Sequence, residues 1–513
     1  MVYKNLIGQK RYIFILVALI IIIYPLIALL LQSFESGSSA FSFIRNQRVI
    51  DLFFKTLFWA LGVSIVTTLI ATCAASYLWI KEKSSSIMVF SFLLLGFLIP
   101  PFVHSATWNQ ILINFFGFSY KAIASMGVAG WVQLSCYIAF ATGIILLALS
   151  KINKQEVAVA KIYRSDLVIF KRVVLPSIKP IIIIVFGLIF MLSFSDYTVP
   201  SLFAQSVYSL EIMAEFNSSY SVTKAMNLSI PLLIVQIIAF AFILTQIKKG
   251  MYQKDKAYNY SISINLPFLV KGVFLVGFIM VLSSIILPIV VLMFNQETLT
   301  ILPQALKASK DELFSSLRIN LLSAISVMIF ILPFSLSILA FKKSKFLVIL
   351  FVIPLIVPSS LIGVSLINGF LGVVPKDIYN SIFMPIMAIW QKSMPFVLLI
   401  NLASLEFLSK KYIEPALLLS SNKKTFIKVL LPLYLPTIIA SFVITFIMGF
   451  NELSATLLVV PPGQSTLAIK IYNYLHYGAA DYVNALCLFV LGMAALSALT
   501  LGYLYKKGRF ARD

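Results

Sequence analysis

The sequence predicts an all-α polytopic membrane protein with about twelve transmembrane helices, arranged as two parallel six-helix repeats. Three observations support this prediction: the composition, the placement of basic residues, and the recurrence of matched segments in the two halves. The chain has 513 residues, of which 60% are hydrophobic and only 11% are charged. Its mean hydropathy is +1.00. A soluble protein of this length would expose far more charge, so the composition indicates a membrane protein.

A helix needs about 20 predominantly apolar residues to cross the hydrocarbon core of a bilayer. The sequence contains twelve such runs, at residues 12–32, 56–80, 87–110, 128–150, 180–203, 228–247, 272–294, 318–341, 346–370, 386–407, 437–459 and 485–505. The third, fifth, ninth and eleventh carry a proline or an acidic residue near one end. The first run is longer than a signal-peptide core and lacks a small-residue cleavage site after it, so we interpret it as a retained anchor.

Most of the basic residues fall on one side of the predicted membrane. The formal net charge is +22, and most of the Lys and Arg residues lie in the two tails and in every second loop. Loops on the opposite side, such as residues 205–227, are neutral or acidic. This bias predicts that both termini lie in the cytosol. The positive charge is explained by topology and by contact with anionic lipid headgroups, so it requires no nucleic acid partner.

The two halves of the chain carry matched segments. FKRVVLP at 170–176 is similar to FIKVLLP at 426–432, which lies 256 residues later. Asp196 and Glu452 each follow the final proline of these peptides by 20 residues, and YSLEI (208–212) is similar to STLAI (465–469). Further matches are the Pro100–Pro101 pair with Pro358, Trp131 with Trp390, and Lys151 with Lys410. A register held over this length predicts duplication of a whole module. Because each half has six spans, both halves would enter the membrane in the same orientation, with a pathway between them.

The loops at 151–180 and 410–436 are longer than an ordinary connection between helices. Each alternates apolar residues with Lys or Arg and ends in Leu-Pro, which predicts that a helix stops before the next span. Two interpretations follow from the residues alone. The loops either dock a partner protein or form interfacial helices that lie on the headgroups.

These loops resemble those of permease subunits of binding-protein-dependent ABC importers of the ferric-iron and thiamine type, with two permease modules fused in one chain. The family pattern is Glu-Ala-Ala, three residues, Gly, nine residues, Ile, one residue, Leu-Pro, and the loop docks a cytosolic ATPase. Both copies keep an acid, a nearby Ala and the Leu-Pro, but they lack the Gly and are out of register by one residue. The residues that the resemblance assigns to ATPase coupling are Glu156, Ala160, Tyr163, Arg164, Ser165, Leu175, Pro176, Glu414, Ala416, Leu419, Ser420, Ser421, Leu431 and Pro432.

A second segment, FNELSATLLVVPPGQSTLAIKIYNYLHYG at 450–478, is similar to the fused iron-type permeases, and residues 194–220 have the matching character. The resemblance implies a type I ABC importer permease fold. Its expected divisions are an N-terminal anchor helix and periplasmic segment (1–54), a first permease module (55–250), a linker with the seventh helix and a periplasmic segment (251–317), and a second module (318–513).

The sequence has no GxxxxGK[ST] phosphate loop, no HExxH zinc pattern and no GxSxG elbow, so we expect a transport subunit rather than an enzyme. The resemblance implies that ATP-Mg binds a separate cytosolic ATPase dimer, that this chain binds no cofactor, and that a periplasmic or lipid-anchored protein delivers substrate. It also implies a multi-pass protein of the bacterial cytoplasmic (inner) membrane. The expected substrate is iron(III), with thiamine, polyamine and phosphonate as alternatives. A twelve-helix secondary transporter and a membrane scaffold are the alternatives of other classes.

Asp196 and Glu452 are the candidate pathway acids, because each lies toward the outer end of a span and charge at membrane depth usually faces a cavity or a partner. The alternative is that both are solvated at the interface. The neighbours assigned to the same pathway or gate are Ser193, Tyr197, Phe450, Asn451 and Ser454. Lys392 is expected to snorkel or to pair. The three cysteines show no metal-binding spacing, and His104 and His476 are too far apart in sequence for a histidine metal site, so no metal site is expected.

Overall fold

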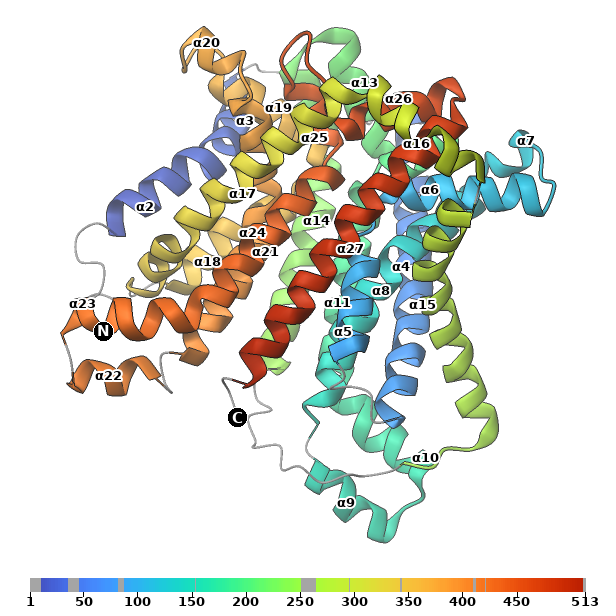
Figure 1. The fold of residues 1–513 in the computed structure, drawn as a ribbon, viewed down its shortest axis with the longest axis vertical. Helices are drawn as coiled ribbons and strands as arrows, with labels where there is room; N and C mark the ends of the chain where they lie inside the picture. Colours follow the sequence, from blue (N-terminus) through green and yellow to red (C-terminus); the bar gives the residue numbers. More distant parts are fainter. Residues whose placement is uncertain are drawn as a thin grey trace.

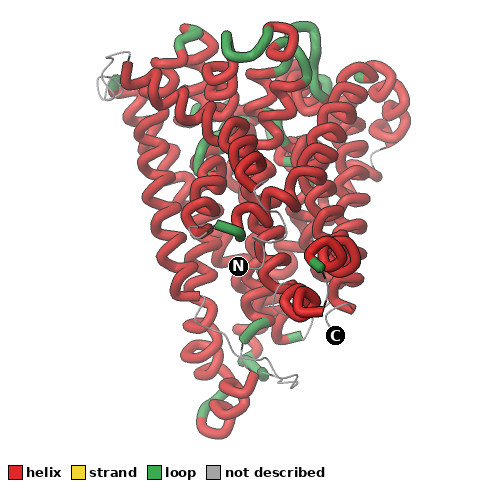
Figure 2. The backbone as a smooth tube through the Cα atoms, turned by 90° about the vertical axis from the view of Figure 1, so that its left-hand side faces the viewer, coloured by secondary structure: helices red, strands yellow, loops and turns green. Residues whose placement is uncertain are grey.

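The computed structural model describes residues 11–35, 46–81, 87–152, 154–250, 264–294, 296–341, 344–408, 412–419 and 421–510. Over these residues the chain is built from helices and loops without any strand (Figure 2). The first-half helices are α2 (Arg11–Ala18), η2 (Leu19–Ile23), α3 (Tyr24–Glu35), α4 (Gln47–Ile80), α5 (Ile87–Leu98), α6 (Pro101–Gln110), η4 (Ile111–Phe115), α7 (Tyr120–Ile123), α8 (Met126–Ser150), α9 (Lys154–Tyr163), α10 (Asp166–Ile169), η5 (Phe170–Val174), α11 (Leu175–Ser195), α12 (Thr198–Leu202), α13 (Tyr208–Ser219) and α14 (Val222–Gly250). The second-half helices are α15 (Phe268–Phe294), α16 (Gln296–Ala308), α17 (Lys310–Leu339), α18 (Ser344–Val352), η6 (Ile353–Leu355), α19 (Ser359–Phe370), α20 (Lys376–Tyr379), α21 (Phe383–Leu408), α22 (Glu414–Leu419), α23 (Asn422–Thr425), η8 (Phe426–Leu430), α24 (Leu431–Asn451), α25 (Ser454–Val459), α26 (Leu467–Tyr477) and α27 (Ala480–Phe510).

The predicted class, an all-α polytopic membrane protein, is confirmed. Within the described residues, ten helical segments are long and apolar enough to cross a membrane, or up to twelve if each of two bent helix pairs counts as one span. Each of the twelve predicted runs falls on one of these segments. The ten straight segments are Tyr12–Gln32, Gln47–Ile80, Met126–Ser150, Asp166–Ser195, Val222–Ile247, Phe268–Phe294, Lys310–Leu339, Phe383–Glu406, Lys423–Asn451 and Ala480–Leu504.

The third and ninth predicted spans are not straight helices. Met88–Leu98 and Pro101–Phe115 meet at 86°, and Ser344–Leu355 and Ser359–Phe370 meet at 105°. Pro100 and Pro358 stand at the two breaks with extended backbones, at ψ 150 and ψ 143, just before α6 and α19. A proline has no N–H to donate to the preceding turn, so the helix ends there and restarts in a new direction.

The fifth and eleventh spans end earlier than predicted. The runs 180–203 and 437–459 continue in sequence, but α11 ends at Ser195 and α24 ends at Asn451. The next residues, Asp196 and Glu452, are extended. Their carboxylates accept from the backbone N–H groups of Thr198 and Ala455, at 2.8 and 2.7 Å. Each acid therefore caps a short following helix, and this alternative to the helical hydrogen bond breaks the span.

The prediction that Leu-Pro stops a helix before the span was wrong in both halves. Pro176 and Pro432 lie in the first turn of α11 and α24, and helical structure continues into them from α10 and α23. A π-helical turn, η5 or η8, precedes each proline, and the N–H of the residue before the proline bonds to Phe170 or Phe426. The wider π turn rearranges the hydrogen bonds where the proline cannot donate one.

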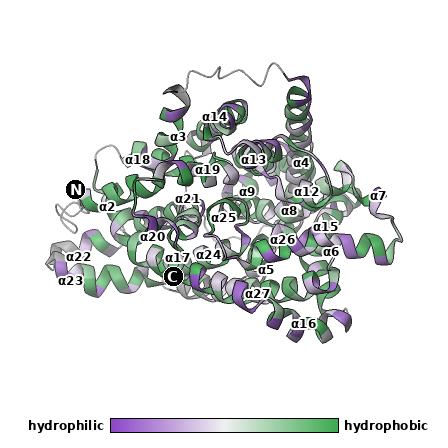
Figure 3. Ribbon diagram, turned by 90° about the horizontal axis from the view of Figure 1, so that it is seen from above, coloured by the Kyte–Doolittle hydropathy of each residue, from purple (hydrophilic) through white to green (hydrophobic). Residues whose placement is uncertain are grey.

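The bundle has an upper face and a lower face, named from Figure 1. α13, α20 and α26 lie at the upper face, whereas α9, α10, α22 and α23 lie at the lower face (Figure 1). Seen from above, hydrophobic residues run along the bundle helices out to its periphery (Figure 3). Helices that are apolar on nearly all sides belong either to a core or to a membrane.

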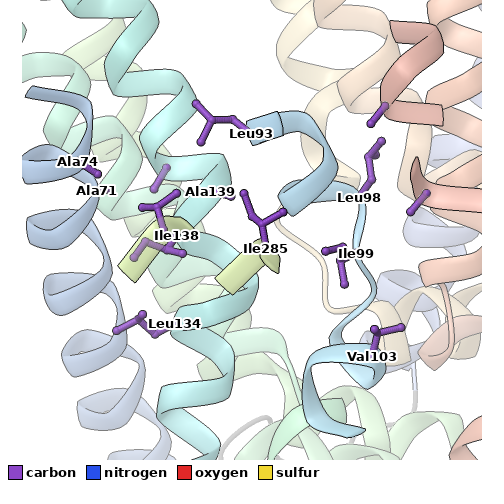
Figure 4. Close-up of a cluster of buried hydrophobic side chains, with 14 of the residues drawn as sticks. Ala71, Ala74, Leu93, Leu98, Ile99, Val103, Leu134, Ile138, Ala139 and Ile285 are labelled. Atoms are coloured by element: carbon purple, nitrogen blue, oxygen red, sulfur yellow. The ribbon is translucent and has the colours of Figure 1, made fainter. Parts of the chain in front are cut away.

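The first helices of the two halves pack across onto the other half. α15 packs along α4 and α8, while α2 packs against α17 and α3 against α19. Gly277 of α15 lies against the α4 backbone, and Gly369 of α19 lies against Pro25 of α3. Figure 4 shows the core where α4, α8 and α15 meet, with Ala71, Ile138 and Ile285 among the buried side chains. Small residues at such crossings allow the close backbone approach that stabilises helix pairs in lipid.

Candidate functional site

Asp196 is held in a hydrogen-bonded chain between α8 and the end of α11. Gln133 Nε2 donates to Asp196 Oδ2 at 2.7 Å, and Ser193 Oγ donates to Gln133 Oε1 at 2.6 Å. The side chains of Gln133 and Ser193 are fully buried. The carboxylate is thus fixed by protein donors rather than left to the membrane interface, as buried polar groups require.

Glu452 has a different partner on the corresponding helix of the second half. It is 6% exposed, and it interacts electrostatically with the half-buried Lys392 of α21. Lys392 follows Trp390 by two residues, just as Gln133 follows Trp131. One acid therefore faces a neutral amide and the other faces a cation. Lys392 was expected to snorkel or to pair; it interacts electrostatically with Glu452, but the two do not form an ion pair among the described residues.

Tyr197 joins the two acid regions. Its side chain is 1% exposed, and it interacts electrostatically with Asp196, Glu452 and Tyr472 and lies beside Ser454. Its hydroxyl makes no hydrogen bond of acceptable geometry to a described atom. Ser201 Oγ and Tyr472 Oη lie 3.4 Å apart. The predicted residues Asp196, Tyr197, Glu452 and Ser454 are thus brought together where the halves meet.

The other predicted pathway residues surround this contact. Phe450 is 2% exposed, and its ring packs edge-on against Phe446 with centroids 5.4 Å apart. Asn451 is half-buried, and its side-chain oxygen has no partner among the described atoms. Both residues lie at the end of α24. The two positions before Glu452 therefore hold a buried aromatic ring and an amide oxygen that has no partner among the described atoms.

The first candidate coupling loop presents an apolar surface at the lower face. Val159, Ile162 and Tyr163 of α9 are 58%, 73% and 77% exposed. Val157 on the other side of α9 is buried in the core and anchors the helix. The remaining assigned residues are exposed at Glu156, Arg164, Ser165 and Pro176, and half-buried at Ala160 and Leu175. Exposed apolar side chains on an anchored helix are typical of a surface that contacts a partner protein or the membrane headgroups.

The second candidate coupling loop lies at the same face (Figure 1). α22 is shorter than α9 and begins at the exposed Glu414; Ala416 is half-buried and its carbonyl accepts from Thr425 Oγ1 at 3.4 Å. Leu419 ends the helix, and Ser420 lies outside the described residues. The other assigned residues are exposed at Ser421 and Pro432, and half-buried at Leu431.

The first loop is also tied to the chain that leads into α15. Asp166 Oδ2 accepts from the backbone N–H of Asn265 at 2.5 Å, and Lys161 Nζ lies 3.8 Å from Asp166 Oδ1. Ile264 and Leu266 are buried in the same core as Val157. α9 is therefore connected through Asp166 to the segment that leads into α15. No sequence motif marks this contact, because its partners are about 100 residues apart.

Two matched ion pairs lie at the upper face, one between α4 and α13 and one between α17 and α26. The basic residue is on α4 in the first pair, whereas it is on α26 in the second. Arg48 of α4 pairs with Glu211 of α13 at 3.0 Å, and Glu312 of α17 pairs with Lys470 of α26 at 2.8 Å. The first N–H of α13 donates to Thr56, and the first N–H of α26 donates to Ser316. α13 begins at Tyr208 and α26 begins at Leu467. The match of YSLEI with STLAI aligns Tyr208 with Ser465, so α26 begins two residues later than that match predicts.

The ion pair between Glu312 and Lys470 predicts a pH-dependent contribution to stability. The hydrogen bond to Glu312 raises the pKa of Lys470 above the ordinary value, so the contribution of Lys470 is present at neutral pH and is lost as pH rises through that raised pKa. We expect Lys470→Gln to destabilise the folded protein by about 1 kcal/mol at pH 7. Thermal unfolding in detergent measures this loss. The exchange Glu312→Lys with Lys470→Glu should recover it, and a double variant no more stable than Lys470→Gln would contradict the assignment.

No group of three or more His, Cys, Asp or Glu side chains within the described ranges is placed to hold a metal ion. Cys136 and Cys487 are buried and Cys73 is half-buried, each within a helix. His104 is fully buried in α6, whereas His476 is exposed and its Nδ1 lies 2.9 Å from the Tyr472 carbonyl oxygen. The two histidines therefore sit in different environments.

Residues 319–507 match the family model described as "Binding-protein-dependent transport system inner membrane component". The chain is similar to the putrescine transport system permease protein PotI of Escherichia coli K12, at 24% identity over 34% of this chain and 63% of that protein. It is 25% identical to the Fe(3+)-transport system permease protein FbpB 2 of Haemophilus influenzae, over 75% of this chain and 76% of that protein. It is 27% identical to the molybdenum transport system permease protein ModB of the same organism, over 30% of this chain and 74% of that protein.

No solved structure gives a significant match to the chain. The chain spans less than two thirds of the length of PotI, and the other relatives named above transport different substrates. Residues 319–507 are thus similar to the inner membrane component of binding-protein-dependent transport systems, and the described residues form a multi-pass helical fold.

Proposed function

We propose that this chain is the transmembrane permease subunit of an ATP-driven ABC importer in the bacterial cytoplasmic membrane. The observation that carries the proposal is the family match over residues 319–507. Similarity to FbpB 2 over 75% of the chain supports extending the same role to the first half. A twelve-helix secondary transporter would not require two exposed loops with the same π turn at one face.

The two halves act as fused permease modules, 55–250 and 318–513, in this proposal. Three pairs of features support it: the π turns η5 and η8, the capping acids Asp196 and Glu452, and the bent pairs that include α6 and α19. The first and seventh spans each pack on the opposite half. This exchange would keep the two modules together while they move against each other.

The proposed mechanism divides the work between the two faces. The lower face is cytosolic, as are both termini, and a separate ATPase dimer with ATP-Mg docks α9 and α22. A binding protein docks the upper face and delivers substrate between the halves. Movement of the docked loops passes through the continuous helices into α11 and α24, which end at the two acids. Rigid-body motion of the modules would then open and close the contact around Tyr197.

Iron(III) is the proposed substrate, supported by the name of FbpB 2 and by its coverage of this chain. A polyamine is the second candidate, because PotI is a putrescine permease and two carboxylates at the contact between the halves suit a cation. Uptake into proteoliposomes that contain this chain, its ATPase and its binding protein would decide between them. Iron(III), putrescine and molybdate should be compared, and ATP-independent uptake would contradict the proposal.

Docking at the first coupling loop can be tested by truncating its exposed apolar residues. We expect Val159→Ala with Ile162→Ala to weaken copurification of the ATPase by at least about tenfold, because apolar area buried at the interface is lost. Adding Glu156→Ala should weaken it further. The matched control is Leu322→Ala with Ile329→Ala, which removes similar exposed side chains from the membrane span α17. Undiminished association in the α9 variant, or an equal loss in the control, would contradict the coupling assignment.

A further inference from the structure

An arginine interrupts an otherwise apolar exposed stripe on α17. Phe314, Leu322, Ile325 and Ile329 are 58%, 40%, 41% and 69% exposed and share one face of this helix. Arg318 is also exposed and lies on the same face. Exposed apolar side chains along a membrane helix face lipid. A guanidinium on such a face is costly unless it finds a polar partner.

None of the acids among the described residues is that partner. The ion pairs formed by the described residues do not include Arg318. Glu312, one turn and a half above it, is occupied by Lys470 at 2.8 Å. Ser315 has a buried hydroxyl with no partner among the described atoms. Arg318 and Ser315 therefore offer donors to a group that the described residues do not supply.

Both residues line a cavity of about 400 Å³. Its walls come from the upper end of α17, from the residue just before α21, and from the loop between α25 and α26. The lining residues are Asp311, Glu312, Phe314, Ser315, Arg318, Ile382, Gly463, Gln464 and Ser465. Among the lining residues, Glu312 is paired with Lys470, whereas Arg318 and Asp311 form no ion pair with a described residue. The cavity thus has one unpaired cation and one unpaired carboxylate among the described residues that line it.

The depth of Arg318 places this cavity at the level of lipid headgroups. α17 has 30 residues, which is about 45 Å of helix, whereas the hydrocarbon core is about 30 Å thick. Arg318 is eight residues from the upper start of α17, or about 12 Å along the axis. It therefore reaches the boundary between hydrocarbon and headgroups in the upper leaflet.

We propose that the cavity binds the headgroup of a zwitterionic ethanolamine phospholipid. Its phosphate accepts hydrogen bonds from Arg318 and Ser315, its ammonium faces Asp311, and its acyl chains run along the exposed stripe below. Arginine matches phosphate oxygens because it can donate two parallel hydrogen bonds. Ethanolamine is preferred to glycerol because its ammonium balances the carboxylate of Asp311, which would otherwise face a net anionic lipid.

Lipid retained by the purified full-length chain tests the proposal. After extraction in mild detergent, native mass spectrometry should find bound phosphatidylethanolamine, and Arg318→Gln should lower its occupancy at least about tenfold, since charge-assisted hydrogen bonds are lost. Lys376→Gln, which removes a basic residue of the upper face outside the cavity, should leave occupancy unchanged. Equal retention by the parent and Arg318→Gln would overturn the proposal.

Two further measurements distinguish a lipid from a soluble phosphate compound. They also test the proposal if Arg318→Gln does not fold. Asp311→Asn keeps the phosphate donors, so it should bind phosphatidylglycerol as well as phosphatidylethanolamine; an unchanged preference would contradict the role of Asp311. Thermal stability of the parent should rise with added phosphatidylethanolamine but not with inorganic phosphate or glycerophosphoethanolamine. An equal rise with either soluble compound would show that the cavity binds a free phosphate compound rather than a lipid.

Discussion

Replacing Gly277 by leucine is expected to destabilise the folded protein by about 3 kcal/mol or more, because α15 can no longer lie against α4. A Cβ atom at this position would lie 2.8 Å from Cys73 Cβ, 3.1 Å from the Ile70 carbonyl oxygen and 3.2 Å from the Ala74 nitrogen. Two of these atoms are helix backbone, which cannot move aside as a side chain can. The yield of monodisperse protein in detergent and its midpoint of thermal unfolding measure the effect.

Gly272 provides the matched control on the same helix. A Cβ atom there would meet nothing within 4 Å, so Gly272→Leu should behave like the parent in both measurements. The same loss in both variants would mean that leucine disturbs α15 itself rather than its contact with α4. Normal stability of Gly277→Leu would show that α15 does not pack on α4 as closely as the structure places it.

The positions of the membrane spans could be predicted because their signal is local. Each run is long and apolar, as bilayer thickness requires. The form of four spans could not be predicted. Pro100 and Pro358 mark where helices end, but the 86° and 105° bends depend on what each following helix packs against. Similarly, Pro176 predicts an interruption, whereas the π turn that carries the helix through it depends on packing of the turn before it.

The candidate site was predictable only where the two halves share a pattern. Asp196 and Glu452 stand at matched positions, so the sequence indicates both. Gln133 was missed, although its place two residues after Trp131 matches that of Lys392 after Trp390. Tyr472 has no such signal, because its contact with Ser201 joins residues 271 apart. Contacts at that separation depend on how whole helices dock.

Asp196→Asn is expected to lower substrate uptake at least about tenfold without unfolding the protein. Asparagine keeps the oxygen that accepts from the Thr198 N–H, so the helix cap remains, but its NH2 group replaces the oxygen that accepts from Gln133. What is lost is the charge, whose hydrogen bond with Gln133 contributes about 1.5 to 3 kcal/mol. Uptake by proteoliposomes containing the full transport complex measures the effect. Asp481→Asn, an exposed acid at the start of α27, is the control and should transport normally.

Glu452→Gln should reduce uptake less than Asp196→Asn, because Lys392 already offsets the charge of Glu452. The difference depends on that lysine. Lys392→Gln leaves Glu452 buried without a cation, which is unfavourable in a low-dielectric site, and the second change Glu452→Gln should then restore stability and part of the uptake. If Asp196→Asn transports like the parent, Asp196 does not line the pathway. If Lys392→Gln and the double variant are equally impaired, the lysine does not act through Glu452. The proposed difference between the halves, in which Gln133 is the partner of Asp196 and Lys392 offsets the charge of Glu452, would then be wrong.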